Sequence, residues 1–223
     1  MGDRIEAARS KRRAIVIQVE GMSGTTSWED WHIPFSRDQI TLREAKESLA
    51  KLGAKQKEIP LMIQLVENPK YDIPGIDFFH GAVDLATHDS IHILLGRGLL
   101  PKDEAFVIGF TMGSTDQVTT LEENLYALFS KHLYPKVYQF KDEEIRIFKD
   151  ATKLGFISNC RPLDKIDYAK YLDWKLRDMR QDIGLESDLI LAYFRIEQRR
   201  YPKSKASQRL LAWRSGASSS FSS

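Results

Sequence analysis

The side chains most able to carry chemistry lie together in the run His88-Asp89-Ser90-Ile91-His92. On an α-helix each residue advances by about 100°, so His88 and His92 lie about 40° apart and one turn along the axis. Asp89 stands three residues before His92, which also makes the two neighbours on a helix surface. The spacing predicts that the three side chains converge on a point about 2 Å from each, as a first-row divalent metal ion requires.

Glu104 is the fourth candidate ligand, and the break in the helix before it matters. A helix that ends near Arg97 and a second that starts near Pro101 form a tight antiparallel hairpin. His92 then lies about five residues, or about 7.5 Å, before the turn, and Glu104 about three residues after it, so the two face each other at nearly the same level. Helix bundles assemble metal sites from acidic and histidine side chains in this way. The predicted metal ligands are therefore His88, Asp89, His92 and Glu104.

The chemistry of this ligand set depends on Asp89. Two imidazoles and two carboxylates suit zinc, which we expect first, and also iron or manganese. If Asp89 and Glu104 both bind, the site is four-coordinate and can be closed and structural. If Asp89 is instead a base or an orienting group, a coordination position stays open for water or substrate, and Asp89 is the candidate catalytic residue. The other histidines are left out of the site. His80 lies about 80° around the helix from His88, and His32 and His132 have no charged residue at a spacing that would form a site with them.

The residues around the site predict a mostly helical chain. Thr41 and Glu44 have the spacing of a capping box, which starts a helix. A helix from about residue 75 to 95 carries both histidines, Gly96 lies in the turn that follows, and Pro101 suits the first turn of the next helix. Apolar spacing predicts further helices over residues 59–66, 120–133, 141–154, 165–182 and 187–200.

We therefore expect an all-α fold, a single-domain multi-helix bundle with a short N-terminal extended segment. Residues 1–40 form an N-terminal extension, with a strand over residues 14–20 and an irregular remainder. Residues 41–202 form the helical metal-binding domain. Residues 203–223 are basic and then rich in serine, and this tail is expected to be disordered.

The bulk composition fits an ordinary globular protein. The chain has 223 residues, 42% of them hydrophobic and 29% charged, and its net charge of +2 points neither to nucleic acid nor to a membrane. Cys160 is the single cysteine, which excludes an internal disulfide and a multi-cysteine zinc site. No apolar run approaches the roughly 20 residues that span a bilayer. Because the N-terminal apolar stretch is too short for a signal peptide, and Asp3 and Glu6 disfavour a transit peptide, we expect a cytoplasmic protein.

The motif His88-Asp89-x-x-His92, followed by eleven residues and Glu104, resembles the signature of the coenzyme Q biosynthesis protein 4 family of ubiquinone synthesis. The similarity extends over about residues 60–185. Val83 to Thr87 and Gly109 to Thr115 depart from the family pattern, so the chain resembles a divergent member. Looser agreement is seen at Gly96, in the apolar helix after Glu104, and at Lys153-Leu154-Gly155, Leu176-Arg177-Asp178-Met179-Arg180 and Ile183-Gly184.

This resemblance implies a mostly helical protein that associates peripherally with membranes and binds a long polyprenyl quinone precursor. Such a protein either removes the ring C1 carboxyl group oxidatively or organises the other biosynthetic enzymes. A metal ion can bind the carboxylate or a ring oxygen and stabilise charge as the C–C bond breaks. The resemblance implies that His88, His92 and Glu104 hold the metal and that Asp89 is a fourth ligand or a general base. The expected partners are a prenylated precursor or another lipid, a membrane surface, proteins of the biosynthetic complex and a second copy of the chain, without nucleic acid.

Two other functions stay open from the residues alone. The first is a non-catalytic lipid-binding or scaffold module, in which a closed metal site staples two helices. The second is a phosphohydrolase of the His-Asp superfamily, which uses a helical His-Asp pair but needs an earlier histidine and a later aspartate well separated in sequence. An open metal site binds an exogenous ligand such as azide, whereas a closed structural site does not.

Two further segments have both a functional and a structural interpretation. The apolar run that includes Phe106 and Phe110 suits the wall of a prenyl-tail groove, or a core helix that is buried on all sides. The stretch from Arg195 to Arg214 is basic with interleaved aromatic residues, and suits docking on anionic lipid or a solvated tail. We expect the core helix and the solvated tail.

Overall fold

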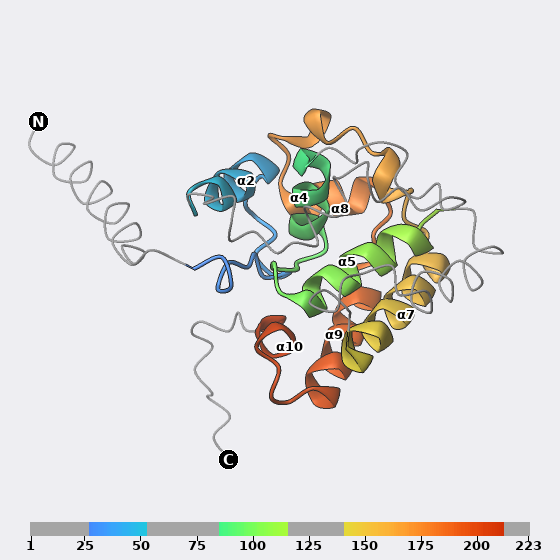
Figure 1. Ribbon diagram of the computed structural model, residues 1–223. Helices are drawn as coiled ribbons and strands as arrows, with labels where there is room; N and C mark the ends of the chain where they lie inside the picture. The colour runs from blue at the N-terminus through green and yellow to red at the C-terminus, as the bar shows by residue number, and fades with distance from the viewer. Residues whose placement is uncertain (1–26, 53–84, 116–140, 212–223) are drawn as a thin grey trace, which may run out of the picture.

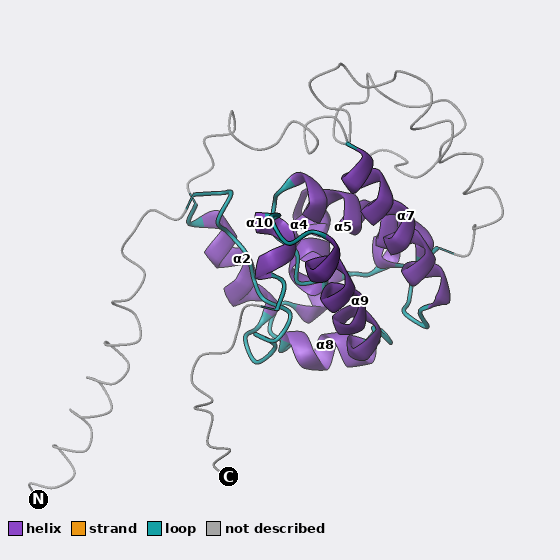
Figure 2. Cartoon of the chain, turned by 90° about the horizontal axis from the view of Figure 1, so that it is seen from below, coloured by secondary structure: helices purple, strands orange, loops and turns teal. Residues whose placement is uncertain are grey.

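The computed structural model describes residues 27–52, 85–115 and 141–211 (Figure 1). Within these ranges the chain forms helices and loops and no strand, apart from one isolated antiparallel bridge between Thr41 and Lys175 (Figure 2). The prediction of an all-α fold is therefore confirmed. The α-helices of the described residues are α2 Leu42–Ala50, α4 Leu85–Leu94, α5 Pro101–Gly113, α7 Asp142–Ile157, α8 Leu176–Asp182, α9 Ser187–Arg200 and α10 Lys205–Arg209.

Helix α2 begins where the capping box predicts. The Thr41 hydroxyl accepts a hydrogen bond from the Glu44 N–H at 3.1 Å, and the Glu44 carboxylate accepts one from the Thr41 N–H at 2.8 Å. The N–H groups of the next two residues donate to the carbonyls of Trp174 and Leu172. The start of α2 is thereby joined to the segment just before α8.

A tight turn joins α4 to α5 and positions the predicted site. The Gly96 N–H donates to the Ile93 carbonyl at 3.1 Å. The Arg97 N–H donates to the His92 carbonyl at 2.9 Å, which completes a Schellman motif. Gly96 has a φ of 65°, which glycine adopts without steric cost. Pro101 is the first residue of α5, so the predicted end of one helix and start of the next are both confirmed.

Helix α5 is buried from Asp103 to Gly113. It packs against α7 so closely that a Cβ on Gly113 would overlap the carbonyl oxygen of Thr152. Against α9, the rings of Phe106 and Phe194 lie edge to face with their centroids 5.7 Å apart. The apolar run is thus a core helix, as expected, and the helix that carries the fourth candidate ligand is held by two others.

The helix predicted over residues 165–182 is wrong over its first half. The 3₁₀ turns Leu163–Lys165 and Tyr168–Tyr171 occupy this stretch, and α8 begins only at Leu176. The reason lies in contacts between distant segments. Two carbonyls just before α8 accept hydrogen bonds from the start of α2, and the Leu176 N–H donates to the Ile40 carbonyl at 2.9 Å. These bonds replace the bonds of a continuous helix, and apolar spacing does not reveal them.

The prediction of a disordered tail from residue 203 is wrong as far as residue 211. Helix α10 follows α9 directly, and Leu210 is buried at its end. Ser207 is fully buried, and its hydroxyl donates to the carboxylate of Glu197 at 2.9 Å. A basic five-residue helix has too little apolar periodicity to be predicted. Residues 212–223 lie outside the described residues.

The remaining predictions divide into two groups. The helices expected at 141–154 and 187–200 are confirmed as α7 and α9. The strand at 14–20, the helices at 59–66 and 120–133, and the first part (75–84) of the helix predicted over 75–95 lie outside the described residues, as do His80 and His132. The division into three segments stays a prediction. None of the described helices is long and apolar enough to cross a bilayer.

Candidate metal centre

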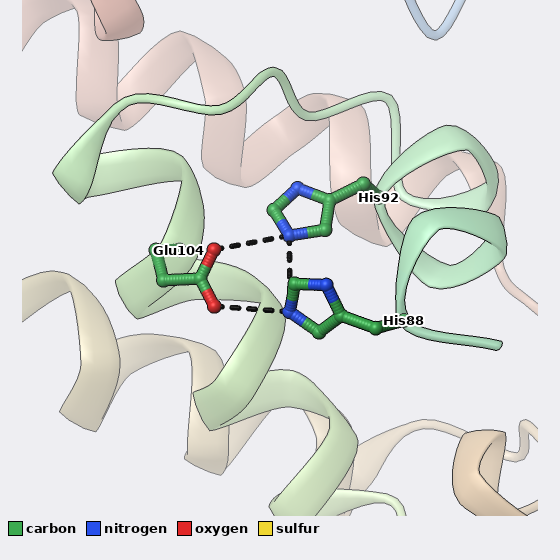
Figure 3. Close-up of side chains that lie close together, drawn as sticks. All are labelled: His88, His92 and Glu104. Atoms are coloured by element: carbon green, nitrogen blue, oxygen red, sulfur yellow. Dashed lines mark hydrogen bonds and ion pairs between the residues drawn. The ribbon is translucent and has the colours of Figure 1, made fainter. Parts of the chain in front are cut away.

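His88 and His92 on α4 and Glu104 on α5 point toward one another across the turn (Figure 3). The His88 Nε2 lies 3.0 Å from Glu104 Oε1, and the His92 Nε2 lies 3.1 Å from Glu104 Oε2. The two Nε2 atoms are 3.3 Å apart. The prediction that Glu104 and His92 face each other at nearly the same level across the turn is therefore confirmed.

These separations suit a metal ion. In a tetrahedral zinc site with bonds of about 2.0–2.1 Å, any two ligand atoms lie about 3.3 Å apart. The separations of 3.0 to 3.3 Å, which join the two nitrogens to each other and each nitrogen to a different oxygen of Glu104, lie close to that value. A cation bound by the two nitrogens and one of these oxygens would have three protein ligands, and a tetrahedral ion would keep a fourth position for another ligand.

The hydrogen bond on the far side of the His92 ring decides which nitrogen faces the site. Its Nδ1 lies 2.7 Å from the carbonyl oxygen of Gly98. Because a carbonyl only accepts, Nδ1 carries the hydrogen and donates it, which leaves the lone pair of the neutral ring on Nε2. That lone pair faces an oxygen of Glu104 at 3.1 Å. Two acceptors at this distance repel each other unless a proton or a metal cation lies between them.

The site is buried and contains an ionised carboxylate. His88, His92 and Glu104 are 6%, 0% and 4% exposed. Burial by itself raises the pKa of Glu104, but the charges and hydrogen bonds of the two imidazoles outweigh it and hold that pKa well below its ordinary value. Glu104 is therefore a carboxylate, the form that binds a metal ion.

Asp89 does not join this group. The potential ligand atoms that lie within 4.8 Å of one another come from His88, His92 and Glu104. Burial raises the pKa of Asp89, and the charges of His88, His92 and Lys46 oppose the shift. A carboxyl group with a raised pKa beside the histidines suits proton exchange. The roles of Asp89 as a fourth ligand and as a catalytic base both stay predictions.

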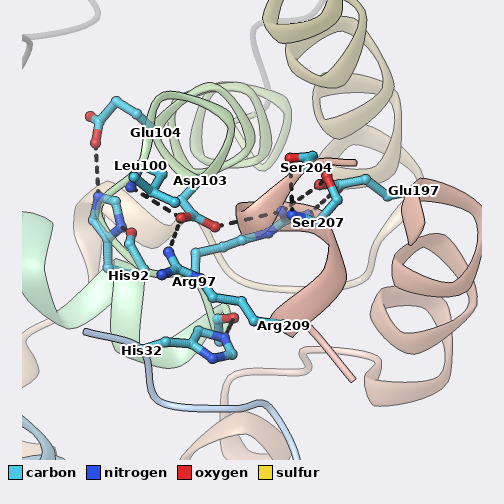
Figure 4. A network of polar contacts seen from close by, with 12 residues as sticks. His32, His92, Arg97, Leu100, Asp103, Glu104, Glu197, Ser204, Ser207 and Arg209 are labelled. Atoms are coloured by element: carbon cyan, nitrogen blue, oxygen red, sulfur yellow. Dashed lines mark hydrogen bonds and ion pairs between the residues drawn. The ribbon is translucent and has the colours of Figure 1, made fainter. Parts of the chain in front are cut away.

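A buried polar network continues from the turn toward the C-terminal helices (Figure 4). Arg97 donates to both carboxylate oxygens of Glu197 on α9, at 2.6 and 3.1 Å. The Asp103 carboxylate accepts from the Leu100 N–H at 3.1 Å and pairs with Arg209 on α10. Sequence reasoning misses this network, because Arg97 only marks the end of a helix there and Arg209 belongs to a stretch expected to be a solvated tail. The sequence offers one clue to this network, which is that two charged residues, Arg97 and Asp103, lie between His92 and Glu104.

The other residues singled out from the sequence have structural places. His32 donates from Nε2 to the Gly96 carbonyl at 2.9 Å, and burial lowers its pKa to about 4. The His32 ring is therefore neutral at pH 7 and closes the turn. Cys160 is buried, and burial raises the pKa of its thiol to about 12.

Comparisons of the chain with protein-family models, with curated proteins and with solved structures find no match. The resemblance to the coenzyme Q biosynthesis protein 4 family therefore rests on the motif and the looser similarities described above, and membership stays a prediction.

Proposed function

We propose that the protein binds one divalent metal ion through His88 Nε2, His92 Nε2 and a carboxylate oxygen of Glu104. The observation that carries this proposal is a buried site in which the two nitrogens lie 3.3 Å apart and each lies 3.0 to 3.1 Å from one oxygen of Glu104. The donor set suits zinc first, and iron or manganese as alternatives. The Gly98 carbonyl holds His92 in the tautomer that a metal ligand needs.

We further propose that the bound metal is catalytic and acts on a prenylated hydroxybenzoate, from which it assists removal of the C1 carboxyl group as CO2, with a proton taking its place on the ring. Three protein ligands with one open position are typical of catalytic zinc sites. The metal supplies Lewis-acid stabilisation of the charge that develops as the carboxyl group leaves. The substrate class comes from the motif's resemblance to the ubiquinone-synthesis family. Asp89 is proposed as the base beside the site, supported by its raised pKa.

A second candidate is a structural metal that staples α4 to α5, in a protein that binds lipid or organises partner enzymes. The observation that favours it is burial, since the most exposed of the three proposed ligands, His88, is only 6% accessible. Structural sites are typically closed to exogenous ligands, whereas catalytic sites keep a position for water or substrate.

Cobalt substitution separates the two candidates. Co²⁺ in place of the native metal has visible absorption bands that respond to each change of ligand. If the site is catalytic, azide and 4-hydroxybenzoate shift these bands in a saturable way. If Asp89 is a base and not a ligand, the shift by 4-hydroxybenzoate persists in the variant Asp89→Asn. If Co²⁺ binds and neither compound changes its spectrum, the catalytic proposal is wrong and the structural staple stands.

A further inference from the structure

The network beside the proposed metal centre contains a cation that comes from the C-terminal part of the described chain. Arg209 on α10 pairs with the carboxylate of Asp103, as Figure 4 shows, and its Nη1 donates to the Glu29 carbonyl at 2.8 Å. Asp103 is fully buried and directly precedes Glu104 in α5. Because Asp103 also accepts from the Leu100 N–H, it fixes the first turn of the helix that carries Glu104.

The same guanidinium touches the other half of the site. A Cβ added to Gly98 would overlap the guanidinium of Arg209, so Gly98 and Arg209 are in close contact. The Gly98 carbonyl accepts the hydrogen bond of His92 Nδ1 at 2.7 Å, and this bond directs His92 Nε2 toward Glu104. Arg209 therefore contacts Gly98, which accepts the hydrogen bond of His92. It also contacts Asp103, which precedes Glu104 in the chain.

Helix α10 gives Arg209 a fixed position. The Ser207 hydroxyl donates to Glu197, the carboxylate that also pairs with Arg97. The side-chain amides of Gln198 and Gln208 each donate a hydrogen bond to the main-chain carbonyl of the other residue at 2.8 Å. These bonds join α10 to α9, so the guanidinium is placed by packed helices and not by a loose tail.

We infer that Arg209 is a positioning residue for the metal centre, acting on Glu104 through Asp103 and on His92 through Gly98. The inference rests on the metal site of the proposed function. Groups that orient metal ligands typically contribute 10- to 100-fold to metal affinity. Since Arg209 acts one contact further out, its removal is expected to weaken affinity at the lower end of that range, by about tenfold.

The test is the Zn²⁺ affinity of the full chain, measured by competition with a chromophoric chelator, for wild type, Arg209→Gln and Arg209→Lys. The matched control is Lys205→Gln, on the same helix. Lys205 is 50% exposed and pairs with the carboxylates of Asp30 at 2.7 Å and of Glu29 at 3.9 Å. We expect Arg209→Gln to bind Zn²⁺ about tenfold more weakly and the control to bind as wild type. Arg209→Lys keeps the positive charge but loses the planar fork, so we expect an intermediate loss, and this variant carries the test if Arg209→Gln does not fold.

A purely structural role predicts a different result. The melting temperature of the Arg209 variants then falls, while their folded form binds Zn²⁺ with wild-type affinity and gives the wild-type Co²⁺ spectrum. If wild type binds metal and the folded Arg209 variants give that result, the inference is overturned and the proposed metal site stands. If wild type itself binds no metal, the proposed function is overturned and the inference falls with it, so the wild-type measurement tells the two failures apart.

Discussion

Arg97→Met removes one partner of an ion pair that has no exposed surface. The side chains of Arg97 and Glu197 are both 0% exposed and joined at 2.6 and 3.1 Å. In the variant, Glu197 keeps only the Ser207 hydroxyl as a hydrogen-bond donor among its described side-chain contacts. The change also removes the guanidinium from the Phe106 ring, whose centroid lies 3.8 Å from the Arg97 Cζ.

The magnitude follows from the unpaired charge. Breaking a buried pair from one side costs about 3–5 kcal/mol, and we take about 4 kcal/mol because methionine retains part of the contact with the ring. With a urea m-value of about 2 kcal/mol/M, the unfolding midpoint falls by about 2 M. This loss is a large fraction of the stability of about 5–15 kcal/mol that a typical protein has.

The assay is urea unfolding followed by circular dichroism, for three variants beside wild type. The double variant Arg97→Met/Glu197→Leu replaces the pair by apolar groups, so it should recover most of the lost stability. The control Arg43→Met breaks an ion pair to Asp173 whose side chains are 49% and 78% exposed, and its midpoint should not change. A fall of less than about 0.5 M for Arg97→Met, or a double variant as unstable as the single one, would refute the reasoning.

Three further predictions concern the surroundings of the site. In His32→Gln, the stability of the fold depends less on pH. The pKa of His32 is about 4 in the folded protein and 6.5 ordinarily, so as pH falls the unfolded wild-type chain takes up the proton first. The free energy of unfolding of wild type therefore falls by up to about 3 kcal/mol between pH 6.5 and 4, and the variant lacks this loss. Urea midpoints at pH 7 and pH 4 check this, and an equal fall in both proteins would contradict it. Gly155→Ala should lower the melting temperature, because its Cβ would overlap the Phe110 carbonyl oxygen and overpacking costs about 1–3 kcal/mol, more than the helix propensity gained; a higher melting temperature in calorimetry would show the reverse. Cys160 should react with a thiol reagent at pH 8 only after unfolding, because its pKa is raised to about 12; rapid reaction of the native protein would count against its burial.

The place of Glu104 could be predicted because local rules decide it. Gly96 ends α4, Pro101 starts α5, and the helical rise then sets Glu104 opposite His92. Asp89 is different, since it lies about 100° around the helix from His88 and about 60° from His92. Sequence spacing makes it a neighbour of His92, but the side facing Glu104 lies between the two histidines. Asp89 is accordingly absent from the group formed by His88, His92 and Glu104.

The remaining misses come from contacts that the sequence does not display. The break before Leu176 depends on hydrogen bonds to the start of α2, about 130 residues earlier in the chain. The docking of α10 depends on a buried serine and on Arg209, both of which are residue types that normally favour solvent. A polar residue can be buried when a partner distant in the sequence completes its hydrogen bonds, and the spacing of apolar residues does not reveal that partner.

The central claim is that His88, His92 and Glu104 bind one metal ion, and elemental analysis of protein purified without added metal tests it most directly. The matched control is Glu144→Gln, which alters an equally buried carboxylate on α7, paired with Lys102 at 3.0 Å. We predict about one equivalent of a divalent metal, zinc first, in wild type and in the control, and a large loss in Glu104→Gln and His92→Ala. Wild type with no stoichiometric metal, or variants that fold and retain the wild-type content, would contradict the claim.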